Sequence, residues 1–541
     1  MLASLAIDNG ANECSADVID DDNYTPPRDA FHTNPQLCKD MIARLASPFP
    51  LEIRSSSICM GSGLFAGAEI DAGREIYCVP LQLAAIDADD TSFCHWCFKD
   101  QKAGFGRPSE DGAVKTCTGC KTARFCSKDC QKQAWTYFHK DECKVLRKAP
   151  KMRTQHLLAH RVFFWLRRGQ NALGKVNRYL ETHFNEFSKN GPRITEIMDI
   201  AMAIHDETGR TTELSLVWRT VPAMRMNCVR LRPPTKKESV GYAFDAVTAT
   251  INHSCDPNAF VFFEGRKLCI RSLKKIAAGE EITICYLDPT LDVAARKALL
   301  KHEYFFDCNC NRCNSEHKEK LSLLRPSKDI EPLHRAQQEV HAVLRSATRA
   351  AKHPGIYPAF DDLPTVETKI RTIINNVFPS APWPEHLEPL PSARLVLANL
   401  YLDQGKAIPA LRNALKGKFR STRRGGGPEW INEMTDVMTV LVIAGSLPRD
   451  AVAYEDKTFP SVDDIKAVTY GYLYEGCRQA GKVFGGEAAY TKGLCSMLTE
   501  MLRTNPGVRV GTKQFRHEFE KAQGTVMAWA GMKPEDGMVL S

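Results

Sequence analysis

Apolar positions along this 541-residue chain follow two different spacings, which predict strands in some stretches and helices in others. Between Leu51 and Pro80, short apolar runs are separated by glycines, a pattern typical of short strands joined by turns. From 154 to 232 the apolar residues instead recur at helical spacing, beginning with Leu157, Leu158, Val162, Phe163 and Leu166. We therefore expect a β-rich segment followed by a helical one.

Strand-like patterning returns at Tyr242. The apolar stretches Phe260–Phe263 and Leu268–Ile270 flank a polar turn that contains Gly265, which predicts a β-hairpin. Glu281–Tyr286 predicts one further strand. The β pattern that stops near Cys94 is thus expected to resume only after the helical segment.

From Cys313 to its end the chain is predicted to be mostly helical, with two connectors, the proline-rich Pro379–Pro391 and Gly425–Gly427. One stretch matches part of the tetratricopeptide (TPR) consensus, in which paired helices meet at small residues. Its matching residues are Leu397, Leu400, Tyr401, Gly405, Ala410 and Ala414. A single partial repeat is compatible with a TPR-like arrangement and with a plain helical bundle.

Composition places the chain among globular proteins, with 43% apolar and 25% charged residues, and its length suggests several domains. Val437–Ala444 is among the most apolar stretches and is far shorter than the roughly 20 residues that span a bilayer. The first ten residues lack the basic residues of a secretory signal, and the acidic run after them is atypical of a mitochondrial presequence. We expect no membrane association, and a cytoplasmic or nuclear location.

The net charge of +8 is concentrated in one segment. Between Lys115 and Arg153, eleven lysines and arginines stand against three acidic residues, an excess equal to the charge of the whole chain. Such a segment suits an acidic protein partner or a nucleic acid, or is a solvated face without a partner.

Cysteine spacing is the strongest chemical signal among the 20 cysteines. Four ligand pairs, enough for two tetrahedral zinc sites, are Cys94 with Cys97, Cys117 with Cys120, Cys126 with Cys130, and His139 with Cys143. A second cluster, Cys308, Cys310 and Cys313, lacks a fourth ligand. Without a signal for an oxidising compartment, most of the other cysteines are expected to be core thiols: Cys14, Cys38, Cys59, Cys78, Cys228, Cys255, Cys269, Cys285, Cys477 and Cys495.

The ligand order between 94 and 143 resembles the MYND zinc finger, because the histidine is the seventh of eight ligands. The aromatic Phe125 before Cys126 and the residues Gln131, Ala134 and Trp135 also match that family. Ligands four residues apart are expected to share one face of a helix. By resemblance, one zinc is held by Cys94, Cys97, Cys126 and Cys130, and the other by Cys117, Cys120, His139 and Cys143.

Two later motifs, Asn252–Asn258 and Gly279–Tyr286, resemble those of SET-domain protein lysine methyltransferases. With the MYND module and the later cysteine cluster, residues 51–315 resemble the SET-and-MYND (SMYD) family. The stretch Leu300–Cys308 matches the approach to that family's post-SET zinc. Beyond 316 the likeness is limited to a helical ending.

The resemblance assigns roles to individual residues. Tyr286 would align a lysine amine with the methyl group in an in-line displacement that depends on alignment and a dry channel, and Tyr304 would line that channel. S-adenosylmethionine would contact Gly61, Ser62, Gly63, Asn227, Asn252, His253 and Phe306. Cys255 would join Cys308, Cys310 and Cys313 as the fourth ligand of a third zinc ion.

Three residues depart from the family pattern. The first cofactor loop of the family commonly has a basic residue and an asparagine where this chain has Met60 and Ser62. An aromatic residue before the Asn-His pair is replaced by Asp245. A carboxylate there would alter peptide preference at the lysine entrance, or would face solvent.

The expected fold is α+β and multidomain: a SET β fold with a pseudoknot, an inserted MYND finger, a helical insertion and a helical C-terminal domain that is TPR-like or a plain bundle. Its parts are a polar, partly disordered lead-in (1–47), the first SET part (48–93), the MYND finger (94–143), the helical insertion (144–240), the SET core (241–290), the post-SET zinc segment (291–316) and the C-terminal domain (317–541).

The expected function is S-adenosylmethionine-dependent methylation of a lysine in a histone or another protein by a monomer that holds three zinc ions. The alternative is a catalytically weak adaptor whose MYND module binds proline-rich partners. A third hypothesis, a nucleic-acid-binding protein, rests only on the basic segment. It predicts that nucleic-acid binding weakens steeply as the salt concentration rises.

Overall fold

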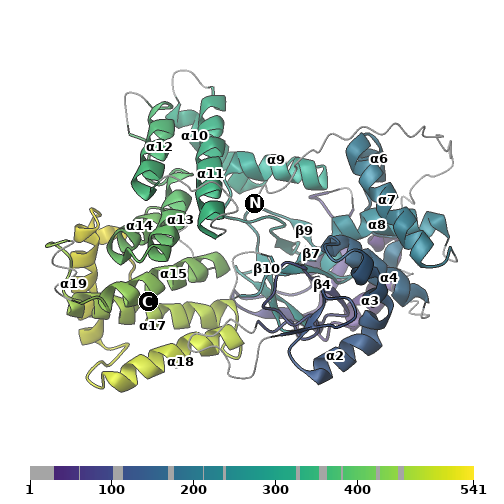
Figure 1. Cartoon of the computed structure of the whole chain (residues 1–541), viewed down its shortest axis with the longest axis horizontal. Helices are drawn as coiled ribbons and strands as arrows, with labels where there is room; N and C mark the ends of the chain where they lie inside the picture. Colours follow the sequence, from purple (N-terminus) through teal and green to yellow (C-terminus); the bar gives the residue numbers. More distant parts are fainter. Residues whose placement is uncertain are drawn as a thin grey trace.

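The computed structural model describes residues 30–59, 61–100, 114–167, 176–210, 213–234, 239–324, 329–352, 362–378, 382–421, 427–448 and 456–540. Short strands occupy the middle of the molecule (Figure 1). The C-terminal helices lie on one side of them, and the helices between 128 and 227 lie on the other. The predicted α+β class with a large helical C-terminal part is confirmed.

The two β-rich segments of the sequence form one unit, because their strands pair across the intervening helices. β3 (Glu75–Pro80) pairs antiparallel with β11 (Lys267–Ser272), which also pairs with β10 (Ala259–Glu264). β8 (Gly241–Phe244) lies between β4 (Leu83–Ile86) and β7 (Val229–Arg230). Smaller pairs are β1 (Leu51–Ser55) with β2 (Ser62–Ala66), β5 (Lys115–Thr116) with β6 (Arg124–Phe125), and β9 (Asn252–His253) parallel to β12 (Thr283–Ile284).

The predicted hairpin is formed by β10 and β11, and Gly265 in its turn has a φ of +55°, which favours glycine. The strand predicted over Glu281–Tyr286 is shorter than expected. Only Thr283–Ile284 pairs with β9, because Glu281 bridges to Phe65 and the backbone N–H of Tyr286 donates to a side chain.

The N-terminal segment corrects one prediction. Residues 1–47 were expected to be a polar, partly disordered lead-in, yet Phe31–Thr33 form a 3-10 turn, η1, and Pro35–Ala43 form α1. Phe31, Cys38, Met41 and Leu45 are buried in the same core as the strands. The apolar residues of this segment are few, and their partners lie far away in sequence, so the pattern alone did not reveal the packing.

At the end of the zinc module, the predicted MYND finger over 94–143, three helical segments follow one another directly. They are α2 (Lys128–Ala134), the π-helical turn η2 (Trp135–His139) and α3 (Lys140–Lys148). His139 and Cys143 therefore share a continuous helix, as predicted. Cys126 does not share one with Cys130, because α2 begins only after Ser127, whose hydroxyl accepts a hydrogen bond from the Cys130 N–H. The helical insertion follows with α4 (Thr154–Arg167), α6 (Phe184–Ser188), α7 (Gly191–Glu207), α8 (Leu214–Asn227) and, after β8, the 3-10 turn η3 (Thr248–Thr250).

The C-terminal part is helical throughout its described residues, and neighbouring helices pack in pairs. Ala410 and Ala414, of the partial TPR match, are buried where α13 and α14 meet. The elements are α9 (Val293–Tyr304), α10 (Asn311–Leu323), α11 (Glu331–Lys352), α12 (Leu363–Asn375), α13 (Leu390–Asp403), α14 (Ala407–Phe419), α15 (Pro428–Gly445), α17 (Val462–Val483), α18 (Ala489–Thr504), α19 (Lys513–Trp529) and η4 (Pro534–Asp536). None of the described helices combines the length and apolar content needed to cross a bilayer.

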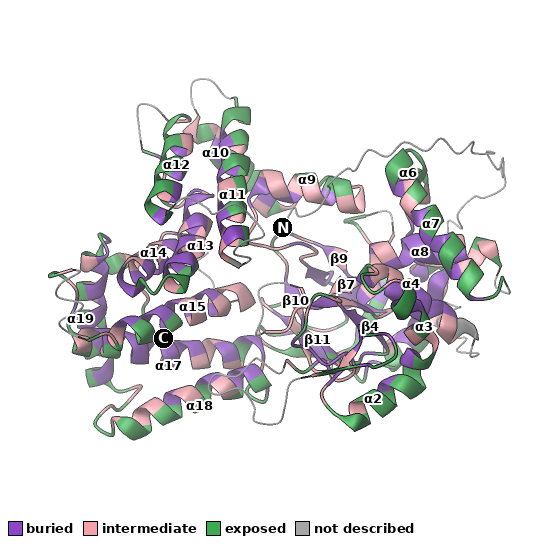
Figure 2. Cartoon of the chain, in the orientation of Figure 1, coloured by how far each residue is buried: buried purple, intermediate pink, exposed green. Residues whose placement is uncertain are grey.

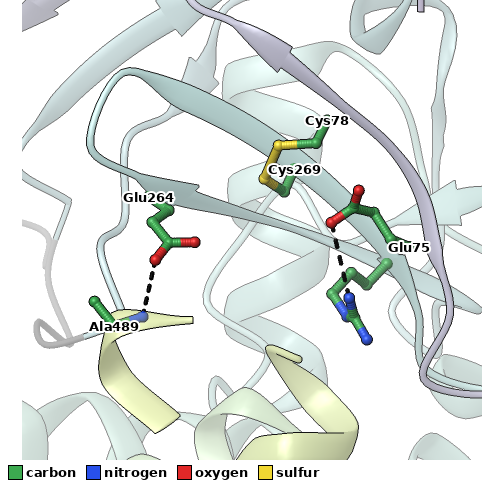
Figure 3. The surroundings of a disulfide bond; sticks show 6 residues. Glu75, Cys78, Glu264, Cys269 and Ala489 are labelled. Carbon is green, nitrogen blue, oxygen red and sulfur yellow. Dashed lines mark hydrogen bonds and ion pairs between the residues drawn. A yellow bond between two sulfur atoms is a disulfide. The ribbon is translucent and has the colours of Figure 1, made fainter. Parts of the chain in front are cut away.

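The C-terminal helices dock on the outer face of the β10–β11 hairpin. The ring of Phe484 lies 5.9 Å from that of Phe260 and 5.6 Å from that of Phe262, and all three are buried. Figure 2 shows much of β11 and α17 in the colour of buried residues. The Glu264 carboxylate accepts a hydrogen bond of 2.8 Å from the Ala489 N–H at the start of α18 (Figure 3). The β unit and the helical domain thus share one buried contact.

Cys78 and Cys269 correct a second prediction. They face each other in the register of β3 and β11 and are joined by a disulfide bond, which Figure 3 shows beside the Glu264 contact. Both were expected to be free thiols. They are 191 residues apart in sequence, so only the pairing of the strands brings them together. Cys38 and Cys228 are buried free thiols, as expected.

Candidate functional site

Three groups of four ligand side chains are gathered so that all ligand atoms of a group lie within 4.8 Å of one another. They are Cys94, Cys97, Cys126 and Cys130; Cys117, Cys120, His139 and Cys143; and Cys255, Cys308, Cys310 and Cys313. These are the sets that the resemblance implied, including the crossed pairing in the zinc module and Cys255 as the distant fourth ligand.

The distances within the groups suit a tetrahedral zinc ion. The Sγ atoms of Cys97 and Cys126 are 3.7 Å apart, and the Sγ of Cys120 lies 3.8 Å from Nε2 of His139. In the third group, the Sγ of Cys255 lies 3.9 Å from that of Cys308. A tetrahedron with zinc–sulfur bonds of about 2.3 Å places its sulfurs just under 4 Å apart. The donor sets and their spacing therefore fit zinc.

The second zinc group is tied to the helical insertion through a buried carboxylate. Nδ1 of His139 lies 3.1 Å from the Glu142 carboxylate, and Arg161 of α4 donates two hydrogen bonds to it, of 2.7 and 3.0 Å. Arg161 also donates to the backbone carbonyl of Ala84, and its guanidinium lies 3.7 Å from the centre of the Phe138 ring. Burial opposes ionisation of Glu142, yet the Arg161 charge helps to lower the pKa of that carboxyl to about 2. The zinc module and the helical insertion therefore share a buried ion pair, which also contacts β4 through the Ala84 carbonyl.

Tyr286 lies just after β12, and its hydroxyl donates a hydrogen bond of 2.7 Å to the backbone carbonyl of Ile251. Its ring centre lies 5.0 Å from that of Tyr304 and 5.2 Å from that of His253. Burial raises the pKa of Tyr286 well above its usual value and that of Tyr304 to about 12. Both hydroxyls are therefore protonated at neutral pH.

His253 connects Tyr286 with the third cysteine group. The backbone N–H of Tyr286 donates to Nδ1 of His253 over 3.0 Å, so the neutral ring carries its proton on Nε2. Nε2 lies 3.2 Å from the Sγ of Cys255. Both ring nitrogens thus bind protein groups, and His253 can offer a bound molecule only its ring surface and its backbone.

The loop that begins β2 lies against Asn252. The Asn252 amide donates to the backbone carbonyl of Ser62 over 3.0 Å and to the buried Glu281 carboxylate over 2.7 Å. Glu281 also accepts from the hydroxyl of Ser56. A Cβ atom at Gly63 would come within 2.3 Å of a Glu281 oxygen, so this close approach requires glycine.

The Ser62 loop, Asn252–His253 and Phe306 contact one another in turn and together make the predicted cofactor surface. Ser62 contacts Asn252, which precedes His253, and the His253 ring centre lies 5.8 Å from that of the half-buried Phe306. A narrow polar loop beside an aromatic ring fits a ligand that has both a charged amino-acid end and a flat base. The residues present therefore fit S-adenosylmethionine.

The Asn227 side chain is bonded to backbone carbonyls and not to the residues of this surface. Its amide N–H groups donate to the backbone carbonyls of Glu181 and Ala223 over 2.7 and 2.8 Å, so only its carbonyl oxygen remains for a ligand. It lines the large cavity that also reaches Tyr286.

Asp245 is bonded to the start of η3. Its carboxylate accepts hydrogen bonds from the N–H and the hydroxyl of Thr248, over 2.8 and 2.7 Å. The Thr248 hydroxyl in turn lies 2.8 Å from that of Tyr77. Asp245 therefore orients the turn that leads into Asn252. Met60, another departure from the family pattern, lies outside the described residues.

A cavity of about 800 Å³ separates the β unit from the C-terminal helices. Tyr286 and Tyr304 line it from one side, and Glu429 and Trp430 of α15 from the other. It is large enough for several residues of an extended peptide, and Tyr286 is one of its lining residues.

Sequence reasoning missed three contributors to this region. Glu281 lies inside a recognised motif, but the sequence suggested no role for it. Arg161 belongs to a helix that was predicted from its apolar residues alone. His32 lies in the N-terminal segment that was expected to be a polar lead-in. Arg161 and His32 have no local sequence signal, and the motif that contains Glu281 does not reveal its partners, because each of the three acts on a residue distant in the chain.

Comparison with known proteins agrees with these observations. The family model of the SET domain matches residues 61–287. Relatives include "SET domain and MYND-type zinc finger protein 6" of Schizosaccharomyces pombe, 28% identical over 50% of this chain and 55% of the relative. "Histone-lysine N-methyltransferase SMYD3" of Homo sapiens is 31% identical over 38% of this chain and 49% of the relative.

The alignment with "N-lysine methyltransferase SMYD2" of Gallus gallus has 27% identity and covers 50% of this chain and 61% of that protein. The chain thus spans about half the length of the relatives that it matches. The solved SET domain of LSMT bound to lysine and AdoHcy superposes with 10% identity over 90% of this chain and 96% of that one, at a TM-score of 0.33, which is too remote to bear on the site. The chain thus contains a SET domain, and the SET-domain match, the relatives' names and the eight-ligand module that interrupts the strands together support its similarity to the SET-and-MYND (SMYD) family.

Proposed function

We propose that this chain is an S-adenosylmethionine-dependent protein-lysine N-methyltransferase that acts on a histone or another protein. The observation that carries the proposal is the position of Tyr286, which lines a cavity large enough for a peptide and packs against His253 of the predicted cofactor surface. Two of the relatives are named as lysine methyltransferases.

The side chains support alignment rather than proton abstraction. Because the Tyr286 hydroxyl donates its hydrogen bond to the Ile251 carbonyl, its oxygen can accept a hydrogen bond from a lysine amine. Burial raises the pKa of the Tyr286 phenol, so the hydroxyl stays protonated at neutral pH and cannot act as a base. Tyr286 thus orients the amine, while the ring of Tyr304 excludes water from one side of it.

When bound, S-adenosylmethionine would supply a methyl group on a sulfonium. A neutral lysine amine would attack that carbon in line, the thioether S-adenosylhomocysteine would leave, and the methylated nitrogen would lose its proton to water. Gly61, Ser62, Gly63, Asn252 and the ring of Phe306 would hold it. Of these, Asn252 is fixed by Ser62 and Glu281. This pre-arranged contact lowers the cost of ordering the loop when the ligand binds.

The test combines calorimetry of S-adenosylmethionine binding with transfer of a labelled methyl group to proteins of a cell extract. Saturable one-to-one binding together with label in protein would support the proposal. A chain that binds no cofactor would refute it, and one that binds cofactor but labels no protein would favour the adaptor function instead.

We further propose that the chain holds three zinc ions, one in each ligand group. Native protein should contain three equivalents by elemental analysis. Cys308→Ser should contain two, and it should bind S-adenosylmethionine at least about tenfold more weakly, because Phe306 lies two residues from the lost ligand. Cys495→Ser, which removes an exposed cysteine outside the three groups, should retain all three. Two equivalents in the native protein would contradict the third site.

An adaptor function is favoured by one feature of the zinc module. Trp135 and Tyr137 of η2 are both more than 40% exposed, and the Tyr137 ring centre lies 5.4 Å from that of Trp96. Exposed aromatic rings beside basic residues suit a proline-rich segment, which is stiff and loses little entropy on binding. Trp135→Ala should weaken capture of such a peptide and leave S-adenosylmethionine affinity unchanged.

A further inference from the structure

The N-terminal segment reaches the predicted cofactor loop through one residue, His32. Its backbone N–H donates to the hydroxyl of Ser62 over 3.0 Å, and its ring Nδ1 lies 3.1 Å from the same oxygen. His32 is separated from Ser62 by 30 residues, and the sequence gives no sign of the contact.

The Ser62 contact is compatible with a proton on Nε2 of His32. The Ser62 oxygen accepts from the His32 backbone, and its hydroxyl proton can donate to Nδ1. A neutral ring whose Nδ1 accepts carries its proton on Nε2, and a charged ring carries one there as well. Nε2 is a donor in both of these states, and it has no hydrogen-bond partner among the residues that the structure describes.

Neighbouring contacts hold His32 in place. Phe31 is 4% exposed and stacks on Tyr179 with ring centres 5.6 Å apart, and the Asn34 amide donates to the Tyr179 hydroxyl over 2.8 Å. Asn34 also caps α1, because its side chain accepts from the N–H of Leu37. A residue anchored on both sides loses little freedom when it binds a ligand.

His32 also lies next to the group that defines the predicted cofactor surface. Ser62 accepts from His32 through its hydroxyl and from Asn252 through its backbone carbonyl. S-adenosylmethionine carries one anionic group, the carboxylate of its amino-acid end. A hydrogen bond from an N–H to a carboxylate is about twice as strong as one between neutral groups.

We propose that His32 is a cofactor-binding residue, whose Nε2–H donates to the carboxylate of S-adenosylmethionine at the Ser62 loop. The inference rests on the proposed function and deepens it, because it assigns the amino-acid end of the cofactor to a contact from the N-terminal segment.

The test compares two ligands that differ only in this carboxylate, S-adenosylmethionine and decarboxylated S-adenosylmethionine, by calorimetry on the full-length chain. His32→Ala should lower affinity for the first by about tenfold and change affinity for the second by less than twofold. Glutamine places an amide near the position of Nε2, so His32→Gln should retain most of the affinity for S-adenosylmethionine. Gln36→Ala, an exposed change in the same segment, should alter neither affinity.

Each other outcome counts against the inference. Unchanged affinity of His32→Ala for S-adenosylmethionine would overturn it, and equal losses for both ligands would show that His32 only supports the loop. A lowered melting temperature of His32→Ala, with His32→Gln as weak as His32→Ala, would likewise show a purely structural role. If the wild-type chain binds neither ligand, both the proposed function and this inference fail. If the wild-type chain binds both ligands and His32→Ala binds them equally well, only the role of His32 fails.

Discussion

Tyr286→Phe is expected to reduce methyl transfer by about a hundredfold or more, roughly 2.7 kcal/mol, while S-adenosylmethionine affinity stays within a few fold. The substitution keeps the ring between His253 and Tyr304 and removes only the hydroxyl. That oxygen, oriented by its bond to the Ile251 carbonyl, is the group that would align the lysine amine. The measurements are single-turnover methyl transfer and calorimetry.

A matched control separates catalysis from stability. Tyr470 also donates its hydroxyl to a backbone carbonyl, that of Met501, but it lies in the C-terminal helices. Tyr470→Phe should cost about 1 kcal/mol of stability and leave methyl transfer unchanged. Asn252→Ala should show the opposite pattern to Tyr286→Phe, with cofactor affinity lost first. Undiminished transfer by Tyr286→Phe would reject the assignment of Tyr286.

The largest expected effect on stability comes from Arg161→Leu. It would leave the fully buried Glu142 carboxylate without its guanidinium partner, and an unpaired buried charge costs about 3 kcal/mol or more. We expect the first thermal transition to fall by several degrees, and the second zinc group to release metal more readily, because Glu142 also contacts His139. Scanning calorimetry and a zinc-release assay measure the two effects.

Two further variants isolate the cause. Arg147→Leu removes an exposed arginine of α3 and should change stability by less than about 0.5 kcal/mol. Glu142→Gln combined with Arg161→Leu removes both charges, while glutamine can still accept from His139. The double variant should therefore be more stable than Arg161→Leu alone. If the double variant is the less stable of the two, the buried charge is not the reason for the loss.

The same ion pair changes how the zinc module is understood. From the sequence the module is an insertion, which suggests that it folds and acts independently of the β unit. Glu142 and Arg161 connect it to α4, and Phe138 packs in the same core as the strands. Substitutions on the exposed lysines Lys128, Lys132, Lys140 and Lys144 should still spare cofactor binding, because those side chains point to solvent. Changes in the buried part should not.

The sequence by itself revealed the resemblance to the SMYD family, the α+β class and the members of all three cysteine groups. These features depend on short motifs, such as Cys-x2-Cys or Asn252–His253, whose spacing reflects local geometry or matches a known pattern. The hairpin around Gly265 belongs with them, because a turn and its flanking strands are neighbours in sequence.

Only the tertiary structure decided what depends on residues far apart in the chain. The Cys78–Cys269 bond, the Glu142–Arg161 pair and the His32–Ser62 contact join residues separated by 191, 19 and 30 positions, and no periodicity records such pairs. The contact of Asp245 with the start of η3 was not predicted for a different reason, since a carboxylate before a short turn can also face solvent. Burial and the partner of each side chain are set by the packing of the whole chain, and a motif specifies only its own residues.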